Sequence, residues 1–279
     1  MSLSVLSCST SCNVTDLRDK VSSAQDEINL KLYRRSDLVK DYTRVNLDPP
    51  EAVVMVRYRD DIHRRRVLDL GCGAGRLAFY LRPLTDKYVG VDFSPHMVQY
   101  CQRNFSGLSF AQGDMRDLTR FDAGSFDTVF AINNLFDAVS HEDRLQVLGE
   151  VRRVLAAGGL LVFSAHNRNC TLGTAAPQLE FKLNPLYQLR GVVAYLRSVV
   201  NHRRIKPRQR FERDYALLND GAHNHSVLHY YILRNVQAKQ LAGAGFELIE
   251  CLDESGQTLH PGDDDSACSS IYYLARPKA

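Results

Sequence analysis

Three glycines at alternate positions are the residues best placed to bind a ligand through the backbone. Gly71, Gly73 and Gly75 follow the short apolar run at 67–70, and a segment with helical spacing of its apolar residues begins at Arg76. An apolar run broken by glycine predicts a buried parallel strand and a tight turn. After such a turn, the first N–H groups of a helix are free to bind an anionic group. This stretch therefore predicts a ligand-binding loop.

The spacing of these glycines differs from the nicotinamide and flavin fingerprint G-x-G-x-x-G. The third glycine comes one position early, and Arg76 stands where the last glycine would be. Dinucleotide-binding proteins need that last glycine to pack the helix closely against the strand. The spacing therefore argues against a dinucleotide.

Two further apolar runs end in a carboxylate. Asp92 ends the run at 88–92, where it could accept hydrogen bonds from both hydroxyls of a ribose. The segment 108–115 ends in Asp114 and Met115, a carboxylate and an apolar side chain that could contact an adenine. Aspartate is also common in surface turns, which is the alternative for Asp114.

Polar residues follow the fourth and fifth apolar runs, at 128–132 and 160–164. Carboxyl ends of parallel strands are where doubly wound folds bind ligands. We therefore expect Asn133 to line the ligand and other residues after these two runs to face a substrate, namely Asn134, Phe136, Asp137, Asn167 and Arg168. His166 can take a proton from a hydroxyl or an ammonium near neutral pH, so it is the acid/base candidate. The alternative is a histidine that bonds only to the backbone.

Five motifs in this order resemble those of the class I S-adenosylmethionine-dependent methyltransferases. They lie at 67–75, 90–94, 113–115, 126–133 and 154–160, and the resemblance covers roughly residues 60 to 166 and resumes near 229 to 276. It implies an α/β fold with a doubly wound, seven-stranded, mostly parallel sheet, and S-adenosylmethionine as the cofactor. One departure is Ala157, where the family often has proline. Asn133 to Phe136 also lacks both prolines of the Asn-Pro-Pro-Tyr pattern found in methylases of nucleobase or glutamine nitrogens.

The resemblance implies a set of cofactor-binding residues. In it the glycines pack against the methionyl part, Asp92 holds the ribose, and Asp114 with Met115 frames the adenine. The full set is Asp69, Gly71, Cys72, Gly73, Asp92, Phe93, Met97, Asp114, Met115 and Asn133. Alternatives stay open: Asp69 could serve only the backbone of the turn, Cys72 could be a small filler, and Phe93 and Met97 could fill the core.

Residues 169–228 interrupt the resemblance and are strongly basic. A helix beginning at Asn184 and Pro185 would carry an apolar stripe of Leu186, Leu189, Val193, Leu196 and Val200, with Arg190, Arg197 and Arg204 on another face. Three interpretations remain open. The basic face could be solvated, it could attract a phosphate or carboxylate substrate, or it could make a weak contact with anionic lipid. Without interleaved aromatic residues or an RNA-binding module, we expect no nucleic acid partner.

Histidines gather where the resemblance resumes. His229 and Tyr230 are predicted to project over the substrate as further catalytic residues. His223 and His225 have the spacing of a metal-binding pair, but no acidic partner pattern lies nearby and the implied chemistry needs no metal. We therefore expect no metal site.

Length and composition fit one large α/β domain. The 279 residues are 44% apolar and 24% charged, with a net charge of +3. We expect a disordered tail at 1–15, an N-terminal helical cover at 16–58, the core at 59–168, an inserted helical cap at 169–228 and the rest of the core at 229–279. Seven scattered cysteines without a C-x-x-C pair fit reduced thiols in a cytoplasmic protein, and the N-terminus lacks the features of a secretory signal.

These observations predict methyl transfer to an oxygen or nitrogen atom of a small-molecule acceptor. An acceptor that carries an anionic group is one option. A lipid-linked or membrane-associated acceptor is the alternative substrate. A non-catalytic protein that binds S-adenosylmethionine is the alternative class, because a fold does not fix a function.

Overall fold

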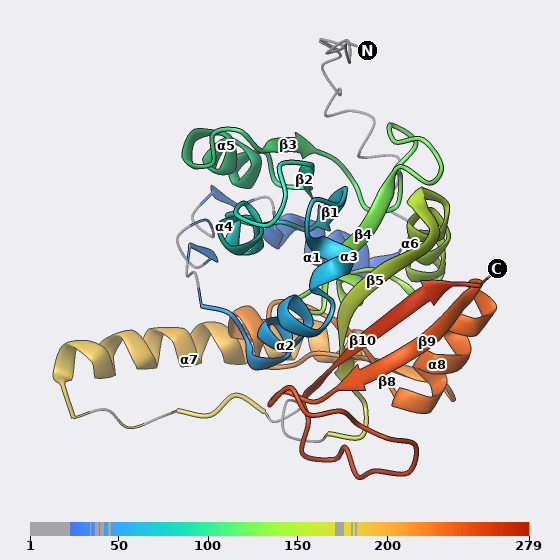
Figure 1. Cartoon of the computed structure of the whole chain (residues 1–279). Coiled ribbons are helices and arrows are strands. Elements are labelled where there is room, and N and C mark those ends of the chain that lie inside the picture. Colours follow the sequence, from blue (N-terminus) through green and yellow to red (C-terminus); the bar gives the residue numbers. More distant parts are fainter. Residues whose placement is uncertain are drawn as a thin grey trace.

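The protein is an α/β sandwich in which helices cover both faces of a central sheet (Figure 1). The computed structural model describes residues 23–33, 35–36, 39, 42–43, 46–170, 176–179, 181 and 183–278. The tail expected at 1–15 lies outside these residues. The strands are β1 (Val67–Leu70), β2 (Tyr88–Asp92), β3 (Ser109–Gln112), β4 (Phe126–Ala131), β5 (Leu155–Asn167), β6 (Arg210–Phe211), β7 (Tyr215–Leu218), β8 (His229–Ile232), β9 (Phe246–Leu252) and β10 (Ser270–Pro277).

The helices alternate with the strands of the core, as in doubly wound folds. They are α1 (Ala24–Tyr33), α2 (Pro49–Arg57), α3 (Arg59–Ile62), α4 (Arg76–Leu81), α5 (Pro95–Asn104), α6 (His141–Val154), α7 (Pro185–Ile205) and α8 (Arg234–Gly243), with short 3-10 turns η2 (Leu135–Ala138), η3 (Lys206–Arg208) and η4 (Ala222–Asn224). None of the helices within the described ranges is both long enough and apolar enough to cross a membrane.

The core sheet has the strand order β3-β2-β1-β4-β5-β10-β9. Every pair from β3 to β5 is parallel, whereas β10 runs antiparallel to both β5 and β9. The seven-stranded, mostly parallel sheet is therefore confirmed. Strand β1 lies between β2 and β4. From β1 the strand order goes to one side through β2 and β3, and to the other side through β4 and β5. This is the topological switch point at which such sheets bind ligands.

The insert contributes two short antiparallel strands as well as a helix. Strands β6, β7 and β8 pair in series, and β8 pairs in parallel with the end of β5, where His166 aligns with Tyr231. The helix predicted for the inserted cap is present as α7, and the sequence did not indicate the short strands β6 and β7 beside it. Strand β7 is a short apolar run without a strong turn signal beside it, so the sequence does not distinguish it from a loop. Its pairing with β8 makes it a strand.

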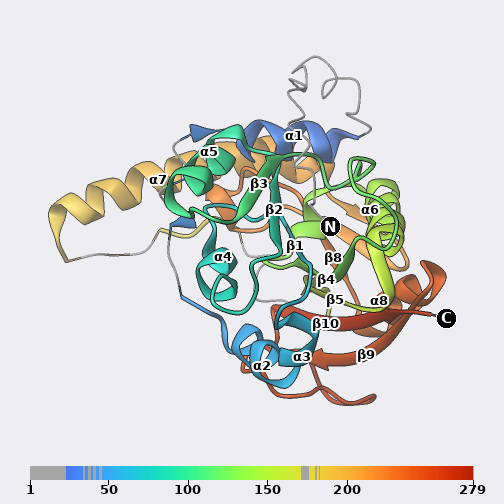
Figure 2. The ribbon, with the colours of Figure 1, turned by 45° about the horizontal axis from the view of Figure 1, so that its top comes forward.

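Helix α1 lies across the edge of the sheet where the parallel strands end (Figure 2). Two buried amide side chains fasten it there. Asn29 Nδ2 donates to the carbonyls of Ala138 (2.7 Å) and Leu228 (2.8 Å), and Gln25 Nε2 donates to those of Asp137 (3.0 Å) and Leu228 (3.1 Å). The predicted N-terminal helical cover is present in α1, held mainly through backbone carbonyls.

Candidate active site

A cavity of about 480 Å³ opens at the carboxyl ends of β1, β2 and β4, under α1. The glycine loop, Asp92, Met115 and Asn133 form its floor, and Asn29 and Tyr33 of α1 form part of its roof. His166 and His229 line its far end. One cavity therefore joins the residues predicted for the cofactor to the histidines predicted for acid/base chemistry.

The glycine loop adopts backbone angles that other residues rarely accept. Gly71 has φ +63° and Gly75 has φ +83°, both in the left-handed region. A Cβ at Gly71 would come within 2.5 Å of the Leu135 side chain, and one at Gly75 within 2.4 Å of the Phe105 ring. Both glycines are therefore required by conformation and by packing, and they bring the loop backbone to the cavity wall.

Asp92 organises this loop as well as facing the cavity. The Gly73 N–H donates to Asp92 Oδ2 (2.9 Å), and the Ser94 N–H donates to Asp92 Oδ1 (2.8 Å). Burial raises the pKa of this carboxyl, while the two backbone N–H groups lower it. Each oxygen keeps a second lone pair, so the carboxylate can still accept hydrogen bonds from a vicinal diol.

Asp69 is a buried carboxyl held by a tyrosine. It is 2% exposed, and the Tyr88 hydroxyl donates to its Oδ2 (2.6 Å). Burial raises the pKa of Asp69 to about 7, although the hydrogen bond from Tyr88 and the charge of Arg76 both lower it. Asp69 also lines the cavity, so its role in organising the ligand stays a prediction.

This pKa predicts how folding stability depends on pH. The folded state keeps the Asp69 proton up to about pH 7, whereas the unfolded chain releases it near pH 4. The contribution of Asp69 to stability is therefore full below about pH 4 and is lost as the pH rises through about 7. In an Asp69→Asn variant the side chain stays neutral. As the pH is raised from 5 to 8, we therefore expect the melting temperature of the wild type to fall relative to that of the variant. A constant difference across this range would contradict the prediction.

The residues predicted to frame the adenine lie at the cavity wall. Phe93, Met97 and Met115 line it. Asp114 lines it too, but its oxygens accept from the Arg116 guanidinium at 2.7 to 3.1 Å. The adenine contact of Asp114 stays a prediction, and the ion pair gives this carboxylate a structural partner that the sequence did not indicate.

Of the four residues after β4 that were predicted to line the site, the two asparagines line the cavity. Asn133 and Asn134 both have φ +55°, and this left-handed turn starts the 3-10 turn η2. The turn directs Phe136 into the core, where it is fully buried against Phe163 with ring centroids 5.2 Å apart. Asp137 is fully buried too, in an ion pair with Arg144. The prediction that Phe136 and Asp137 face substrate was therefore wrong.

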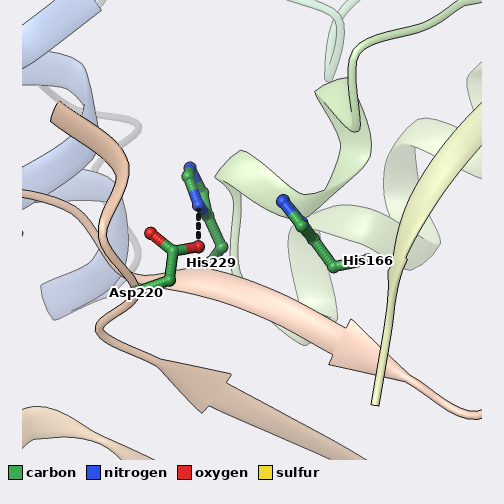
Figure 3. Close-up of side chains that lie close together, drawn as sticks. All are labelled: His166, Asp220 and His229. Atoms are coloured by element: carbon green, nitrogen blue, oxygen red, sulfur yellow. Dashed lines mark hydrogen bonds and ion pairs between the residues drawn. The ribbon is translucent and has the colours of Figure 1, made fainter. Parts of the chain in front are cut away.

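Two histidines that line the cavity lie side by side, and each is bonded to a carboxylate; Figure 3 shows both histidines and one of the carboxylates, Asp220. His166 Nδ1 lies 2.8 Å from Asp137 Oδ2, and His229 Nδ1 lies 2.7 Å from Asp220 Oδ2. The two imidazole rings stack with centroids 4.9 Å apart and an interplanar angle of 19°. A carboxylate at Nδ1 fixes the proton on that nitrogen and leaves Nε2 as the proton acceptor. Asp137 therefore supports His166 from behind without lining the cavity.

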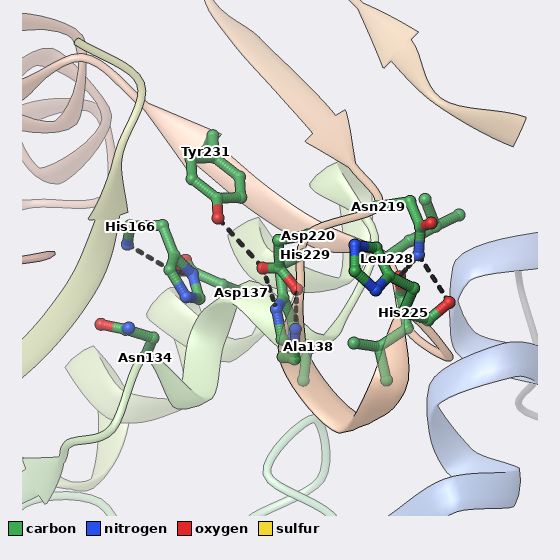
Figure 4. A network of polar contacts seen from close by, with 12 residues as sticks. Asn134, Asp137, Ala138, His166, Asn219, Asp220, His225, Leu228, His229 and Tyr231 are labelled. Atoms are coloured by element: carbon green, nitrogen blue, oxygen red, sulfur yellow. Dashed lines mark hydrogen bonds and ion pairs between the residues drawn. The ribbon is translucent and has the colours of Figure 1, made fainter. Parts of the chain in front are cut away.

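The two supporting carboxylates have different surroundings (Figure 4). Asp137 also pairs with the buried Arg144, which compensates its charge. Asp220 instead accepts from the Tyr231 hydroxyl (3.0 Å) and the Ala222 N–H (3.0 Å). Although burial acts to raise it, the pKa of Asp220 is lowered to about 2 by the hydrogen bond and charge of His229, the charge of His166 and the Ala222 N–H. Asp220 therefore stays ionised and holds the proton of His229 on Nδ1.

His166, Asp220 and His229 also offer ligand atoms within 4.8 Å of one another, a group that could hold a metal ion. Asp220 is the acidic partner that the sequence did not indicate. Both Nδ1 atoms already face a carboxylate, so a metal would have the two Nε2 atoms and an Asp220 oxygen. Asp220 Oδ2 already accepts from His229 and Tyr231, and Oδ1 accepts from the Ala222 N–H. The carboxylate–histidine pairs account for these contacts without an ion.

Three predicted residues point away from the cavity. Tyr230 is fully buried, with its hydroxyl 2.8 Å from His141 Nδ1. Asn167 is fully buried, and its amide donates to the carbonyls of Asp265 and Cys268. The Arg168 guanidinium donates to the carbonyls of residues 212, 213 and 215 and so anchors the insert. The catalytic role of Tyr230 and the substrate roles of Asn167 and Arg168 were therefore wrong. Because side chains alternate along a strand, Tyr230 cannot share a face with His229, nor Asn167 with His166.

A second, basic groove adjoins the cavity between α1 and the carboxyl-terminal half of α7. Its basic lining residues are Lys31, Arg35, Arg197, Arg204 and Arg208. Among the described lining residues the acidic one is Glu27, which is ion-paired with Lys31 at 2.7 Å. The hydrogen bond and charge of Lys31, and then the charges of Arg208 and Arg204, lower the pKa of Glu27. His223 lines both this groove and the cavity, so the two hollows are neighbours.

Comparison with known proteins agrees with this geometry. Residues 67–159 match the profile of a family described as a methyltransferase domain. The chain is 34% identical over 106 residues to the putative methyltransferase YqeM of Bacillus subtilis, and 39% identical over 112 residues to the fatty-acid O-methyltransferase of Mycolicibacterium smegmatis. Each match covers 37% of this chain, but only 42% and 38% of those relatives. The chain thus matches about two fifths of the length of these curated relatives.

Solved structures agree on the fold over nearly the whole chain. A 1,6-didemethyltoxoflavin N1-methyltransferase of Burkholderia thailandensis, solved with S-adenosylhomocysteine, superposes with a TM-score of 0.58 at 15% identity, over 92% of each chain. An S-adenosylmethionine-dependent methyltransferase of Clostridium acetobutylicum gives the same TM-score and identity over 90% of this chain and 98% of that one. At such identity the likeness shows the fold alone.

Residues 67–159 therefore match a methyltransferase domain, and the chain has the fold of the S-adenosylmethionine-dependent methyltransferases to which it is similar, as the five motifs predicted. The residues that line the cavity are chemically suited to S-adenosylmethionine. It offers a carboxylate for a diol in Asp92, apolar side chains for an adenine in Phe93, Met97 and Met115, and a volume in the range of small-molecule sites.

Proposed function

We propose that this protein transfers a methyl group from S-adenosylmethionine to an oxygen or nitrogen atom of a small acceptor, with His229 as the base. The observation that carries this proposal is the placement of two carboxylate-supported histidines in the same cavity as the glycine loop and Asp92. The proposed location is the cytoplasm, because the cysteines within the described residues are free thiols.

When bound, S-adenosylmethionine supplies an activated methyl group on a sulfonium. The glycine loop and Asp92 would hold the donor, and Asn133 and Asn134 would border its reactive end. His229 Nε2 would accept the proton that the acceptor loses as its oxygen or nitrogen bonds to the methyl carbon. Asp220 would keep the His229 Nδ1 proton in place and stabilise the imidazolium that forms. The roof made by α1 would help to exclude water.

The basic groove supports an acceptor that carries an anionic group. Arg204 and Arg208 lie in a groove that shares His223 with the cavity, so an acceptor bound there could extend to the histidines. Arginine binds carboxylates and phosphates through paired hydrogen bonds, which makes these side chains suitable for either group. This feature favours acceptors with a phosphate or carboxylate at one end and a hydroxyl or amine at the other.

Calorimetric titration with S-adenosylmethionine, S-adenosylhomocysteine and NAD tests the first half of the proposal. We expect micromolar binding of the first two and no binding of NAD. A screen with methyl-labelled S-adenosylmethionine then compares matched acceptors, such as 4-hydroxybenzoate and 4-hydroxybenzyl alcohol, together with fatty acids and hydroxylated phosphate esters. Anionic members should react faster. An Arg204→Gln/Arg208→Gln variant should raise their KM about tenfold without changing the KM of neutral acceptors.

Each outcome has a distinct meaning. Binding of NAD instead of S-adenosylmethionine would overturn the cofactor assignment. Tight binding of both S-adenosyl compounds without turnover on any acceptor would favour a non-catalytic binding protein. If added Zn²⁺ or Mn²⁺ were required for turnover, the histidine cluster would be a metal site and His229 would not be the base.

A further inference from the structure

Helix α7 exposes an apolar stripe that a helix of a folded domain normally buries. Leu186 is 72% exposed, Leu189 62% and Val200 65%, and the segment leading into the helix exposes Phe181 (83%) and Leu183 (94%). Along the whole of α7 the buried residues are Ser198 and Ile205. Figures 1 and 2 both show α7 projecting from the side of the molecule, with only its carboxyl-terminal end against the body.

The stripe is continuous because its members recur at helical spacing. It consists of Leu186, Leu189, Val193, Leu196 and Val200, all of them exposed. Single exposed apolar residues are ordinary, whereas a contiguous exposed stripe marks an interaction site. The interaction partner must therefore offer an apolar layer at least as long as the helix.

The charge around the stripe selects the kind of partner. From residue 181 to residue 211 the sequence contains no aspartate or glutamate, whereas it contains Lys182, Arg190, Arg197, Arg203, Arg204, Lys206, Arg208 and Arg210. A patch of one sign of charge is complementary to a patch of the opposite sign. An unmixed basic helix with an apolar face is therefore complementary to a surface of uniform negative charge above an apolar layer.

We infer that α7 docks on an anionic lipid surface. Leu186, Leu189 and Val193 of the stripe enter the boundary between headgroups and acyl chains, whereas Leu196 and Val200 line the basic groove. Arg190 beside them binds lipid phosphate while its aliphatic stem stays along the helix. This docking goes beyond the proposed methyl transfer and does not depend on it. It would also place the basic groove and the cavity next to the membrane surface, where amphiphilic acceptors are concentrated.

Co-sedimentation of the full chain with vesicles tests this inference. Vesicles of equal parts phosphatidylglycerol and phosphatidylcholine should bind the protein, and vesicles of phosphatidylcholine alone should bind it much less. A Leu186→Asp/Leu189→Asp variant should lower the partition coefficient about 100-fold, because each buried leucine contributes about 1.5–3 kcal/mol. An Arg190→Gln variant should lower it about fivefold, and added salt should weaken binding of the wild type.

Val56→Asp is the matched control. Val56 is an apolar residue on α2 that is 80% exposed, but no exposed stripe surrounds it. This variant should bind vesicles like the wild type. S-adenosylmethionine titration without vesicles should give the same Kd for Leu186→Asp/Leu189→Asp as for the wild type, so a failure of lipid docking can be told apart from a failure of the proposed function.

Three results would overturn the inference. The first is that the wild type does not bind anionic vesicles at low salt. The second is that the wild type and the Leu186→Asp/Leu189→Asp variant bind equally. The third is that the wild type is a dimer in analytical ultracentrifugation and this variant is a monomer. The last result would assign the stripe to a second copy of the chain.

Discussion

Replacing His229 with glutamine is expected to lower kcat for methyl transfer by about 10²–10⁴-fold while leaving the Kd for S-adenosylmethionine unchanged. His229 lies at the end of the cavity opposite the glycine loop, and its Nδ1 is held by an Asp220 carboxylate that stays ionised. Glutamine keeps a polar side chain of similar length but cannot accept the proton that the acceptor loses. The assay is turnover with the acceptor found in the screen, together with calorimetry of the cofactor.

His141→Gln is the control for this substitution. His141 also contacts tyrosines, with its ring stacked on Tyr215 at 4.5 Å and its Nδ1 bonded to Tyr230, but it does not line the cavity. Its replacement should leave kcat within about twofold of wild type, as expected for a group that takes no part in the proton transfer. An unchanged kcat in the His229 variant would mean that the acceptor arrives already ionised, and would remove His229 from catalysis.

Two related variants separate a base from a supporting residue. Asp220→Asn should lower kcat less than His229→Gln and shift the pH profile of kcat, because asparagine no longer stabilises the imidazolium. His166→Gln should have the smaller effect of the two histidine variants, since Arg144 compensates the charge of Asp137. The opposite ranking would make His166 the base.

Asp92→Ala is expected to weaken S-adenosylmethionine binding about 100-fold or more. The carboxylate would lose its hydrogen bonds to the ribose, each contributing about 1.5–3 kcal/mol, and the loop would lose the acceptor for the Gly73 N–H. Calorimetry measures the affinity, and a thermal melt shows whether the variant remains folded. S-adenosylhomocysteine should lose affinity by the same factor, because it carries the same ribose.

Asp127→Ala provides a matched control on the same sheet. Asp127 lies in β4 and pairs with Arg66 at 2.7 Å, outside the cavity. Its loss should leave cofactor affinity unchanged. If Asp92→Ala bound S-adenosylmethionine as tightly as the wild type did, the assignment of this strand end to the ribose would fail.

The cofactor half of the site could be predicted because its parts are local in sequence. Gly71 and Gly73 lie in the loop after β1 and Asp92 ends β2, and the parallel order of the sheet brings such strand ends together without further information. The core fold followed from the same spacing. Asp137 was singled out as well, but its position after a strand could not reveal that the turn at Asn133 and Asn134 directs it behind His166.

In the acceptor half the sequence indicated His166 and His229 but not how they are held, because that depends on pairings between distant segments. Asp220 meets His229 only because β7 and β8 run antiparallel, which returns the chain to the same end of the sheet. The error over Tyr230 was avoidable, since alternation along β8 allows only one of two neighbouring residues to face the cavity. The exposed stripe of α7 was visible as a pattern, but only the structure shows that no described element covers it.

The pairing of β8 with the end of β5 has a consequence for how this protein could diversify. His166 and His229 belong to adjacent strands whose register is fixed by backbone hydrogen bonds, with His166 opposite Tyr231. Helix α7 belongs to the connection between these strands and takes no part in the pairing that sets this register. Insertions or deletions in α7, which lies in this connection ahead of β7 and Asp220, would therefore alter what the molecule recognises while leaving the spacing of the two imidazoles intact. Acceptor range and catalytic geometry can thus evolve independently in this chain.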